Sequence, residues 1–196
     1  MDIKKHHFFA FISRMKYINR WGLMRNTQSE NIQEHSLQVA MIAHALAIIK
    51  NEIFEEYIDA QRVAVLGMFH DCNETITGDL PTPIKYFNID IVKAYKKVEE
   101  ISKNKLISML PEKLKSSYSE LLFNNKKEDE NWKLVKAADK ISAYIKCKEE
   151  EKAGNNEFKK ANETIFKAIK DMNIKEVNYF MDNFIPSFSL TIDELE

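Results

Sequence analysis

The sequence has few of the residues that interrupt secondary structure: only four glycines and four prolines occur among its 196 residues. Most of them stand between periodic segments, where Gly78, Pro81 and Pro83 form one cluster, and Gly67 alone falls inside a helical pattern. No internal repeat, low-complexity linker or clear strand pattern is present. Long stretches between such breaks predict an all-α fold, and the length suits one domain with a sizeable core.

Cysteines are also few, and the sequence has no long apolar run and no excess of one charge. The two cysteines, Cys72 and Cys147, give no disulfide framework, which is typical of the reducing cytoplasm. The longest nearly apolar run, Val39–Ile49, is interrupted by His44 and is too short to cross a bilayer. The net charge is −1, so a general nucleic-acid binder is not indicated, whereas a small anionic substrate needs only one or two cations. We expect a cytoplasmic protein with no membrane or nucleic-acid partner.

Apolar spacing and capping residues place the expected helices. Asn31 is a cap candidate with Glu34 three residues later, as in a capping box, and Asp59 is a second cap candidate. The pattern predicts helices over residues 5–19, 32–50, 60–74, 89–110, 112–123 and 130–152, with one or two more within 157–184.

Three of these helices each bring a candidate metal ligand. His70 and Asp71 follow the apolar run Val63–Phe69, where burial of polar groups is costly unless each finds a partner. His35 lies in the preceding helix, and Asp139 lies among small and apolar residues in a later one. Two imidazoles and two carboxylates suit a divalent ion such as Co, Mn, Fe, Ni or Mg, whereas structural zinc sites more often use cysteines. On an octahedral ion they leave two positions for water and a phosphate oxygen, as metal-assisted hydrolysis requires.

Glu74 is a candidate proton carrier beside this cluster. It follows His70 by four residues, so in a continuous helix it shares that face and can act as general acid or general base. The weaker interpretations stay open: a His-Asp pair alone often arises by chance, and Asp139 alone can be a partner for a cation or a surface charge. His44 is about half a turn from the His35 face, and Cys72 is expected to be a packing residue.

The residues quoted so far, with several further stretches, resemble the bacterial HD-domain 5′-deoxynucleotidases over nearly the whole chain. A His-Asp pair identifies only the HD superfamily, and the stretches around Arg20-Trp21 and Gly78–Pro83 indicate the narrower family. The matching stretches are Asn19-Arg20-Trp21, Met24-Arg25-Asn26, Glu34–Ala40, His70-Asp71, Glu74, Thr77–Pro83, Lys136–Asp139 and Ala153–Phe158.

The resemblance implies a single HD-domain helical bundle over residues 1–196, with a core at about 30–145 on which the N-terminal and C-terminal helices pack. It implies a homodimer that hydrolyses deoxyribonucleoside 5′-monophosphates to deoxyribonucleosides and phosphate. The metal would be a divalent cation, with Co²⁺ effective and Mn²⁺ or another transition metal as alternatives. Its ligands would be His35, His70, Asp71 and Asp139.

The resemblance also implies roles for the other matched residues. Arg20 would orient the phosphate as a catalytic residue, and Glu74 would act in proton transfer. The substrate-binding residues would be Arg20, Trp21, His35, Asp71, Glu74, Asp79, Leu80, Pro81, Thr82 and Asp139. Trp21 would exclude a 2′-hydroxyl sterically, and Asp79 would accept a hydrogen bond from the 3′-hydroxyl.

Other interpretations remain for these residues and for the function. Arg20 can be an exposed arginine at a helix end, Trp21 a core residue, and Asp79 a turn residue. The chain can instead be an HD phosphohydrolase acting on nucleoside triphosphates or cyclic nucleotides, or a non-catalytic module that binds a metal or nucleotide for regulation.

Overall fold

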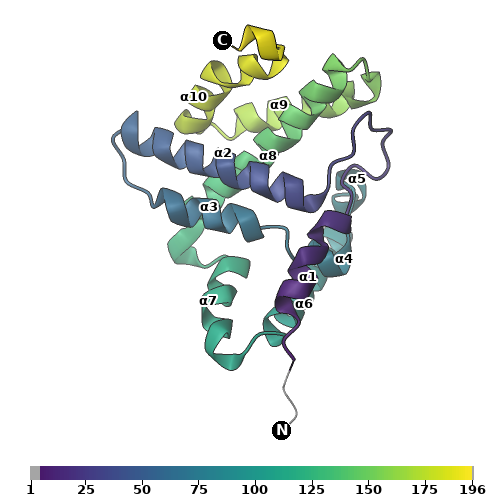
Figure 1. Cartoon of the computed structure of the whole chain (residues 1–196), viewed down its shortest axis with the longest axis vertical. Helices are drawn as coiled ribbons and strands as arrows, with labels where there is room; N and C mark the ends of the chain where they lie inside the picture. Colours follow the sequence, from purple (N-terminus) through teal and green to yellow (C-terminus); the bar gives the residue numbers. More distant parts are fainter. Residues whose placement is uncertain (1–4, 196) are drawn as a thin grey trace.

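The computed structural model describes residues 5–195 and is built from helices (Figure 1). The long ones are α2 Ile32–Glu52, α3 Ala60–Phe69, α6 Ile89–Ser108, α7 Glu112–Leu122, α8 Asp129–Lys152, α9 Lys159–Asp171 and α10 Lys175–Asn183. The short ones are α1 Phe8–Ile12, α4 Glu74–Thr77, α5 Thr82–Lys85 and the 3-10 segments η1 Ser13–Tyr17, η2 Lys126–Glu128, η3 Asn156–Phe158, η4 Ile185–Ser189 and η5 Ile192–Glu194. Residues 5–195 contain no strand, so the prediction of an all-α fold is confirmed.

The core forms where α2 packs against α3, α8 and α10. Figure 1 shows α2 and α3 side by side, with α9 and α10 on one side of this layer and α6 and α7 on the other. The side chains of Leu46, Leu66 and Ile141, one from each of the three central helices, are fully buried. Each such burial contributes about 1.5–3 kcal/mol. The helices that carry the candidate ligands are therefore the most firmly packed part of the molecule.

Both expected helix caps are present. The Asn31 side chain accepts hydrogen bonds from the Gln33 and Glu34 amides, and the Glu34 carboxylate accepts one from the Asn31 amide. The Asp59 side chain accepts from the Arg62 amide. These bonds satisfy backbone donors that a helix start leaves unpaired. The capping box fixes the start of α2, one turn before His35.

The helix expected over residues 60–74 is shorter than predicted. It ends at Phe69, and residues 70–73 form turns in which the Cys72 amide donates to the Phe69 carbonyl and the Glu74 amide to the Asp71 carbonyl. These bonds span three residues rather than four, so the chain tightens and then begins α4 at Glu74. The shared helix face predicted for His70 and Glu74 was therefore wrong.

The two ends of the chain differ from the prediction in smaller ways. The first helix spans residues 8–17 and becomes a 3-10 helix from Ser13 onward. The region 157–184 divides into α9 and α10 at Asn173, whose φ of 49° is left-handed. Within the described residues, no helix has the length and apolar character needed to span a membrane.

Candidate active site

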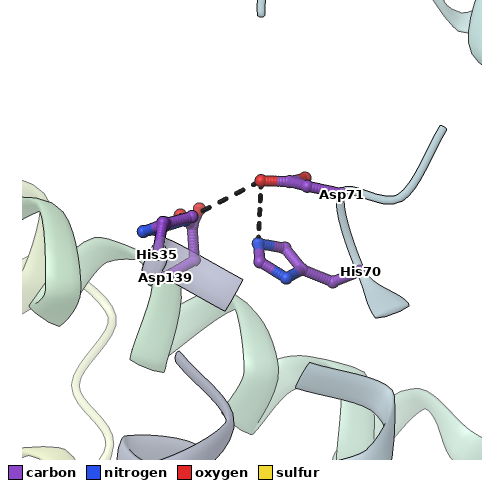
Figure 2. Close-up of side chains that lie close together, drawn as sticks. All are labelled: His35, His70, Asp71 and Asp139. Carbon is purple, nitrogen blue, oxygen red and sulfur yellow. Dashed lines mark hydrogen bonds and ion pairs between the residues drawn. The ribbon is translucent and has the colours of Figure 1, made fainter. Parts of the chain in front are cut away.

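Four predicted ligands meet at one point of the core. His35 comes from α2, His70 and Asp71 from the turn after α3, and Asp139 from α8, and one ligand atom of each lies within 4.8 Å of all the others (Figure 2). Nε2 of His35 is 3.1 Å from Oδ1 of Asp139 and 3.7 Å from Oδ2 of Asp71. Nε2 of His70 is 2.9 Å from Oδ2 of Asp71. Two nitrogen and two oxygen donors thus face a common centre.

Hydrogen bonds from outside the cluster orient the His35 ring. Its Nδ1 lies 3.0 Å from Oγ of Ser142, whose hydroxyl donates to Oε1 of Gln38 at 2.5 Å. The serine proton is used by Gln38, so the serine oxygen accepts from Nδ1–H of His35. Burial and the Arg20 charge lower the pKa of His35, so the ring is neutral and carries that single proton. Its Nε2 therefore points a lone pair at the Asp139 carboxylate.

His70 is oriented in the same way. Its Nδ1 lies 2.8 Å from the Gly67 carbonyl and donates to it, which turns Nε2 toward the cluster. That nitrogen is buried and has no well-directed hydrogen bond to the described residues, although Asp71 is close. Burial opposes a charge on His70, but the Asp71 carboxylate outweighs it and raises the pKa of His70 to about 9.

A divalent cation fits this donor set. Lone pairs of His35 and Asp139 face each other without a proton between them, and Nε2 of His70 has no well-directed hydrogen bond to the described residues. A cation at the centre would satisfy all three groups and displace the His70 proton. His35, His70, Asp71 and Asp139 are therefore the residues able to hold a divalent metal.

A pocket of about 470 Å³ adjoins the cluster at Asp139. Arg20, Trp21, Asp79, Pro81 and Thr82 line it, so the structure brings these predicted residues together. Leu80 is not among the lining residues, and His35 and Asp71 lie behind Asp139, in the cluster. The loop between α4 and α5 and the segment that carries Arg20 thus line the same pocket.

The remaining pocket wall contains residues to which the sequence analysis gave no role. They come from the segment after Trp21, from α8 and from α9: Leu23, Met24, Lys140, Ala143, Lys160, Ala161, Thr164 and Ile165. These side chains are mostly apolar or small. No motif marks the α9 residues, because a helix face of this kind looks like ordinary packing in a sequence.

Glu74 is buried at the start of α4, and its Oε2 has no hydrogen-bond partner among the described residues. Burial first, and then the charges of Asp71 and Asp79, raise the pKa of Glu74 to about 10. The charges of Asp71 in the metal cluster and of Asp79 in the pocket loop thus both act on this carboxyl. The residue is thus near the predicted place, although a turn and not a helix carries it there.

A second set of residues missed by sequence reasoning fixes the segment after Trp21 to α8. The buried Glu150 carboxylate accepts from the Thr27 amide and hydroxyl, from the Gln28 amide and from Asn155, and it pairs with Lys146. Burial alone would raise the pKa of Glu150, but these bonds hold that pKa well below its ordinary value. The segment that carries Arg20 and Trp21 is therefore tied to the helix that carries Asp139.

Comparison with known proteins gives matches over the whole described fold. A family of YfbR-like 5′-deoxynucleotidases matches residues 7–188. The chain is 51% identical to a 5′-deoxynucleotidase of Erwinia tasmaniensis, with 96% of each chain covered. It is also 51% identical to the 5′-deoxynucleotidase YfbR of Escherichia coli, with 98% of this chain and 97% of that one covered.

Two solved structures show the same fold. An HD-domain phosphohydrolase from Listeria innocua matches with a TM-score of 0.81 at 24% identity, over 93% of this chain and 88% of the other. The HD phosphohydrolase of cyanophage S-2L, solved with dA and one catalytic Zn²⁺ ion, matches with a TM-score of 0.63 at 18% identity, over 93% and 96%. With its HD-type helical fold and a match that extends over nearly its full length, the chain belongs to the YfbR-like 5′-deoxynucleotidase family.

Proposed function

We propose that this protein hydrolyses deoxyribonucleoside 5′-monophosphates to deoxyribonucleosides and phosphate with the help of a divalent metal ion. The observation that carries the proposal is the junction of the four-ligand cluster with a pocket at Asp139. A phosphate at this junction can reach the metal while its nucleoside occupies the pocket. Identity of about half of all residues with curated 5′-deoxynucleotidases supports the same activity.

His35, His70, Asp71 and Asp139 would hold the metal. When bound, a divalent ion supplies positive charge to a phosphoryl oxygen and lowers the pKa of a water molecule that becomes the nucleophile. A mixed imidazole and carboxylate set suits a transition metal, and we propose that Co²⁺ is effective and that Mn²⁺ is an alternative.

Arg20 would orient the phosphate and stabilise the charge that develops on it. Its planar guanidinium lines the pocket, and a fork of N–H donors matches phosphate oxygens. Glu74 would transfer a proton as the bond between phosphorus and the 5′-oxygen breaks. As an acid it would give the proton to the leaving 5′-oxygen, and as a base it would take one from the attacking water.

Trp21 and Asp79 line the same pocket and would contact the sugar. Asp79 would accept a hydrogen bond from the 3′-hydroxyl, and the rigid indole would leave no room for a 2′-hydroxyl. Leu80, Pro81 and Thr82 would complete the nucleotide site, with His35, Asp71 and Asp139 near the phosphate.

We further propose that residues 1–196 form a single HD domain that assembles as a homodimer in the cytoplasm, without a nucleic-acid or membrane partner. Leu37, Met41 and Ile48 are exposed on α2 and spaced by four and seven residues, so they share one helix face. Such a face supports self-association. The buried thiols of Cys72 and Cys147 are unpaired, which supports a reducing compartment.

The test is a metal-by-nucleotide activity matrix on protein first stripped with a chelator. Deoxyribonucleoside monophosphates should release phosphate when Co²⁺ or Mn²⁺ is restored, and ribonucleotides, triphosphates and cyclic nucleotides should react far less. Asp139→Asn should be inactive, whereas Asp129→Asn, at the exposed start of the same helix, should match the wild type. Turnover of triphosphates or cyclic nucleotides alone, or tight binding with no turnover, would refute the proposal.

A further inference from the structure

One carboxylate oxygen binds both Arg20 and Trp21. Oε2 of Glu30 accepts a hydrogen bond from Nη1 of Arg20 at 2.6 Å and another from Nε1 of Trp21 at 3.0 Å. The side chains of Arg20 and Glu30 are only 12% and 14% exposed, so water screens this contact weakly. Two adjacent residues of the pocket wall thus share a single charged acceptor.

The backbone around this contact is equally constrained. The Arg20 amide donates to the Glu30 carbonyl at 2.9 Å, and an isolated bridge pairs Asn19 with Asn31. Glu30 itself directly precedes the capping box that begins α2 at Asn31 and Glu34. Glu30 therefore lies in a non-helical segment whose backbone is fixed by these bonds and by the start of α2.

Trp21 needs such support because its backbone is left-handed, with φ of 60°. A bulky residue in this region is strained by about 1–3 kcal/mol and persists only where surrounding contacts hold it. The only polar contact of its indole among the described residues is the bond to Glu30. Without that bond, the indole N–H loses its partner, and only the contacts of the ring with Phe158 and with the Arg20 guanidinium remain to orient it.

Arg20 benefits in a different way. Its Nη1 is used by Glu30, whereas Nε and Nη2 make no hydrogen bond to a described residue. One edge of the guanidinium is thus fixed and the remaining donors are free, while the charges of Asp139, Asp71 and Asp79 act on it from the site. A guanidinium group fixed in this way can bind phosphate oxygens with little further loss of side-chain conformational entropy.

We propose that Glu30 is a positioning and specificity-determining residue, which fixes Trp21 for the exclusion of ribonucleotides and Arg20 for the binding of phosphate. The inference rests on the proposed function, and in particular on the roles given there to Arg20 and Trp21. It predicts that sugar discrimination and phosphate affinity depend on one carboxylate outside the metal cluster.

The first experiment compares kcat/KM for a deoxyribonucleotide and its ribonucleotide in Glu30→Ala. The ratio should fall by at least about tenfold, the scale of one hydrogen bond to a charged group, and KM should rise for both substrates. Glu30→Gln keeps an acceptor oxygen without the charge, so it should restore most of the ratio but not the KM.

Glu128→Ala is the matched control. Glu128 is 15% exposed and pairs with Arg62 at 2.5 Å, near the start of α3 and away from the His70 end of that helix. Its loss should lower the unfolding midpoint about as much as Glu30→Ala does, while the sugar ratio stays at the wild-type value. A change of the ratio in Glu128→Ala as large as in Glu30→Ala would overturn the inference.

The second experiment tests whether Glu30 acts through the indole nitrogen. Trp21→Phe removes Nε1–H, so this single substitution should already lower the ratio of the two kcat/KM values. Adding Glu30→Ala to Trp21→Phe should then change the ratio by less than about twofold. Additive losses would overturn the inference. Should Glu30→Ala not fold, Trp21→Phe still decides, because an unchanged ratio in that variant contradicts the role of the bond.

The two proposals fail differently. A wild-type protein that does not hydrolyse deoxyribonucleoside monophosphates refutes the proposed function. Two other outcomes refute only the role of Glu30. In the first, the wild type hydrolyses these substrates but does not distinguish the two sugars. In the second, the wild type is selective and Glu30→Ala has the same ratio.

Discussion

At the scale of single residues, the hydrogen bonds behind the metal cluster matter as much as its ligands. His35 depends on the chain of bonds through Ser142 to Gln38, and His70 depends on the Gly67 carbonyl. Such outer contacts select the tautomer and the ring orientation in which Nε2 can bind a metal. They are therefore expected to set metal affinity.

Replacement of the serine tests this directly. Ser142→Ala should lower the affinity for Mn²⁺ or Co²⁺ by about 10–100-fold, because the His35 ring loses the acceptor that fixes its proton on Nδ1. Isothermal titration of chelator-treated protein measures the affinity. Ser102→Ala is the control, since Ser102 is equally buried in α6 but its hydroxyl bonds only the Val98 carbonyl. Equal affinities in the wild type and Ser142→Ala would contradict the expected role.

Glu74 gives a prediction for the pH dependence of stability. The pKa of about 10 in the folded protein, against an ordinary 4.5, means that the metal-free folded state keeps a proton that the unfolded chain releases. The stability that this proton contributes is lost as the pH rises from 4.5, the pKa in the unfolded chain, toward about 10, the pKa in the folded protein. Chelator-treated Glu74→Gln should therefore unfold at a higher temperature than the wild type, with a gap that widens between about pH 6 and pH 9.

The same variant should lose activity. With metal restored, its kcat should fall by about 100-fold or more, because the amide has no proton to transfer. Thermal scans at several pH values and steady-state kinetics provide the two measurements. A gap that does not depend on pH would show that Glu74 is ionised in the folded protein.

The sequence allowed His70, Asp71 and Asp139 to be chosen as candidate ligands because each stands beside or among apolar residues, and His35 was added as the imidazole on the preceding helix. The partners that orient them were not predictable in this way. Ser142 lies 107 residues from His35 along the chain, and Glu150 lies 123 from Thr27. Serine in a helix and glutamate four residues after lysine are common patterns, so only the fold gives them a role.

At the scale of helices, local signals gave the starts of α2 and α3 but not the end of α3. The caps at Asn31 and Asp59 are decided by neighbouring residues and were predicted correctly. The turn after Phe69 is decided by where His70 and Asp71 must point in the assembled core. The apolar run before this turn contains no residue that signals the end of a helix, so the predicted helix extended too far, to Glu74.

The close approach of α2 and α3 depends on Gly67. A Cβ at this position would lie 2.9 Å from Cα and 3.2 Å from the nitrogen of Ala40, both backbone atoms that cannot move aside alone. Gly67→Ala should therefore force the helices apart and destabilise the protein by about 1–3 kcal/mol, seen as a lower midpoint in urea. It should also weaken metal binding, because the Gly67 carbonyl holds His70.

Gly22→Ala is the companion measurement. A Cβ there meets nothing within 4 Å, so the unfolding midpoint should stay the same or rise slightly. Equal stability of the two alanine variants would mean that α2 and α3 can separate at little cost.

At the scale of the whole molecule, the metal site joins helices that are distant in the sequence. Its candidate ligands come from α2, from the turn after α3 and from α8, so they meet only in the folded state. A metal that binds the native protein alone stabilises it by about 2.7 kcal/mol at one hundred times its dissociation constant. For a chain of this size, removal of the metal should lower the midpoint of thermal unfolding by about 5–10 °C.

Differential scanning calorimetry with chelator and with added Mn²⁺ checks this shift. The exposed variant Asp129→Asn should retain it, and Asp139→Asn should lose it. Identical midpoints with and without the ion in the wild type would argue against a metal held by these four groups.

Two of the helices that line the pocket differ in their relation to the metal cluster. Asp139 borders it from the helix that carries the metal site, whereas Lys160, Ala161, Thr164 and Ile165 border it from α9, which lies outside the ligand cluster. If the pocket receives the nucleoside as we propose, the candidate metal site and much of the nucleoside-binding surface can therefore change independently. Relatives that prefer other nucleosides could arise by substitutions on α9 alone. In the design of an enzyme for a modified nucleoside, the α9 surface can be varied without changing the proposed catalytic groups.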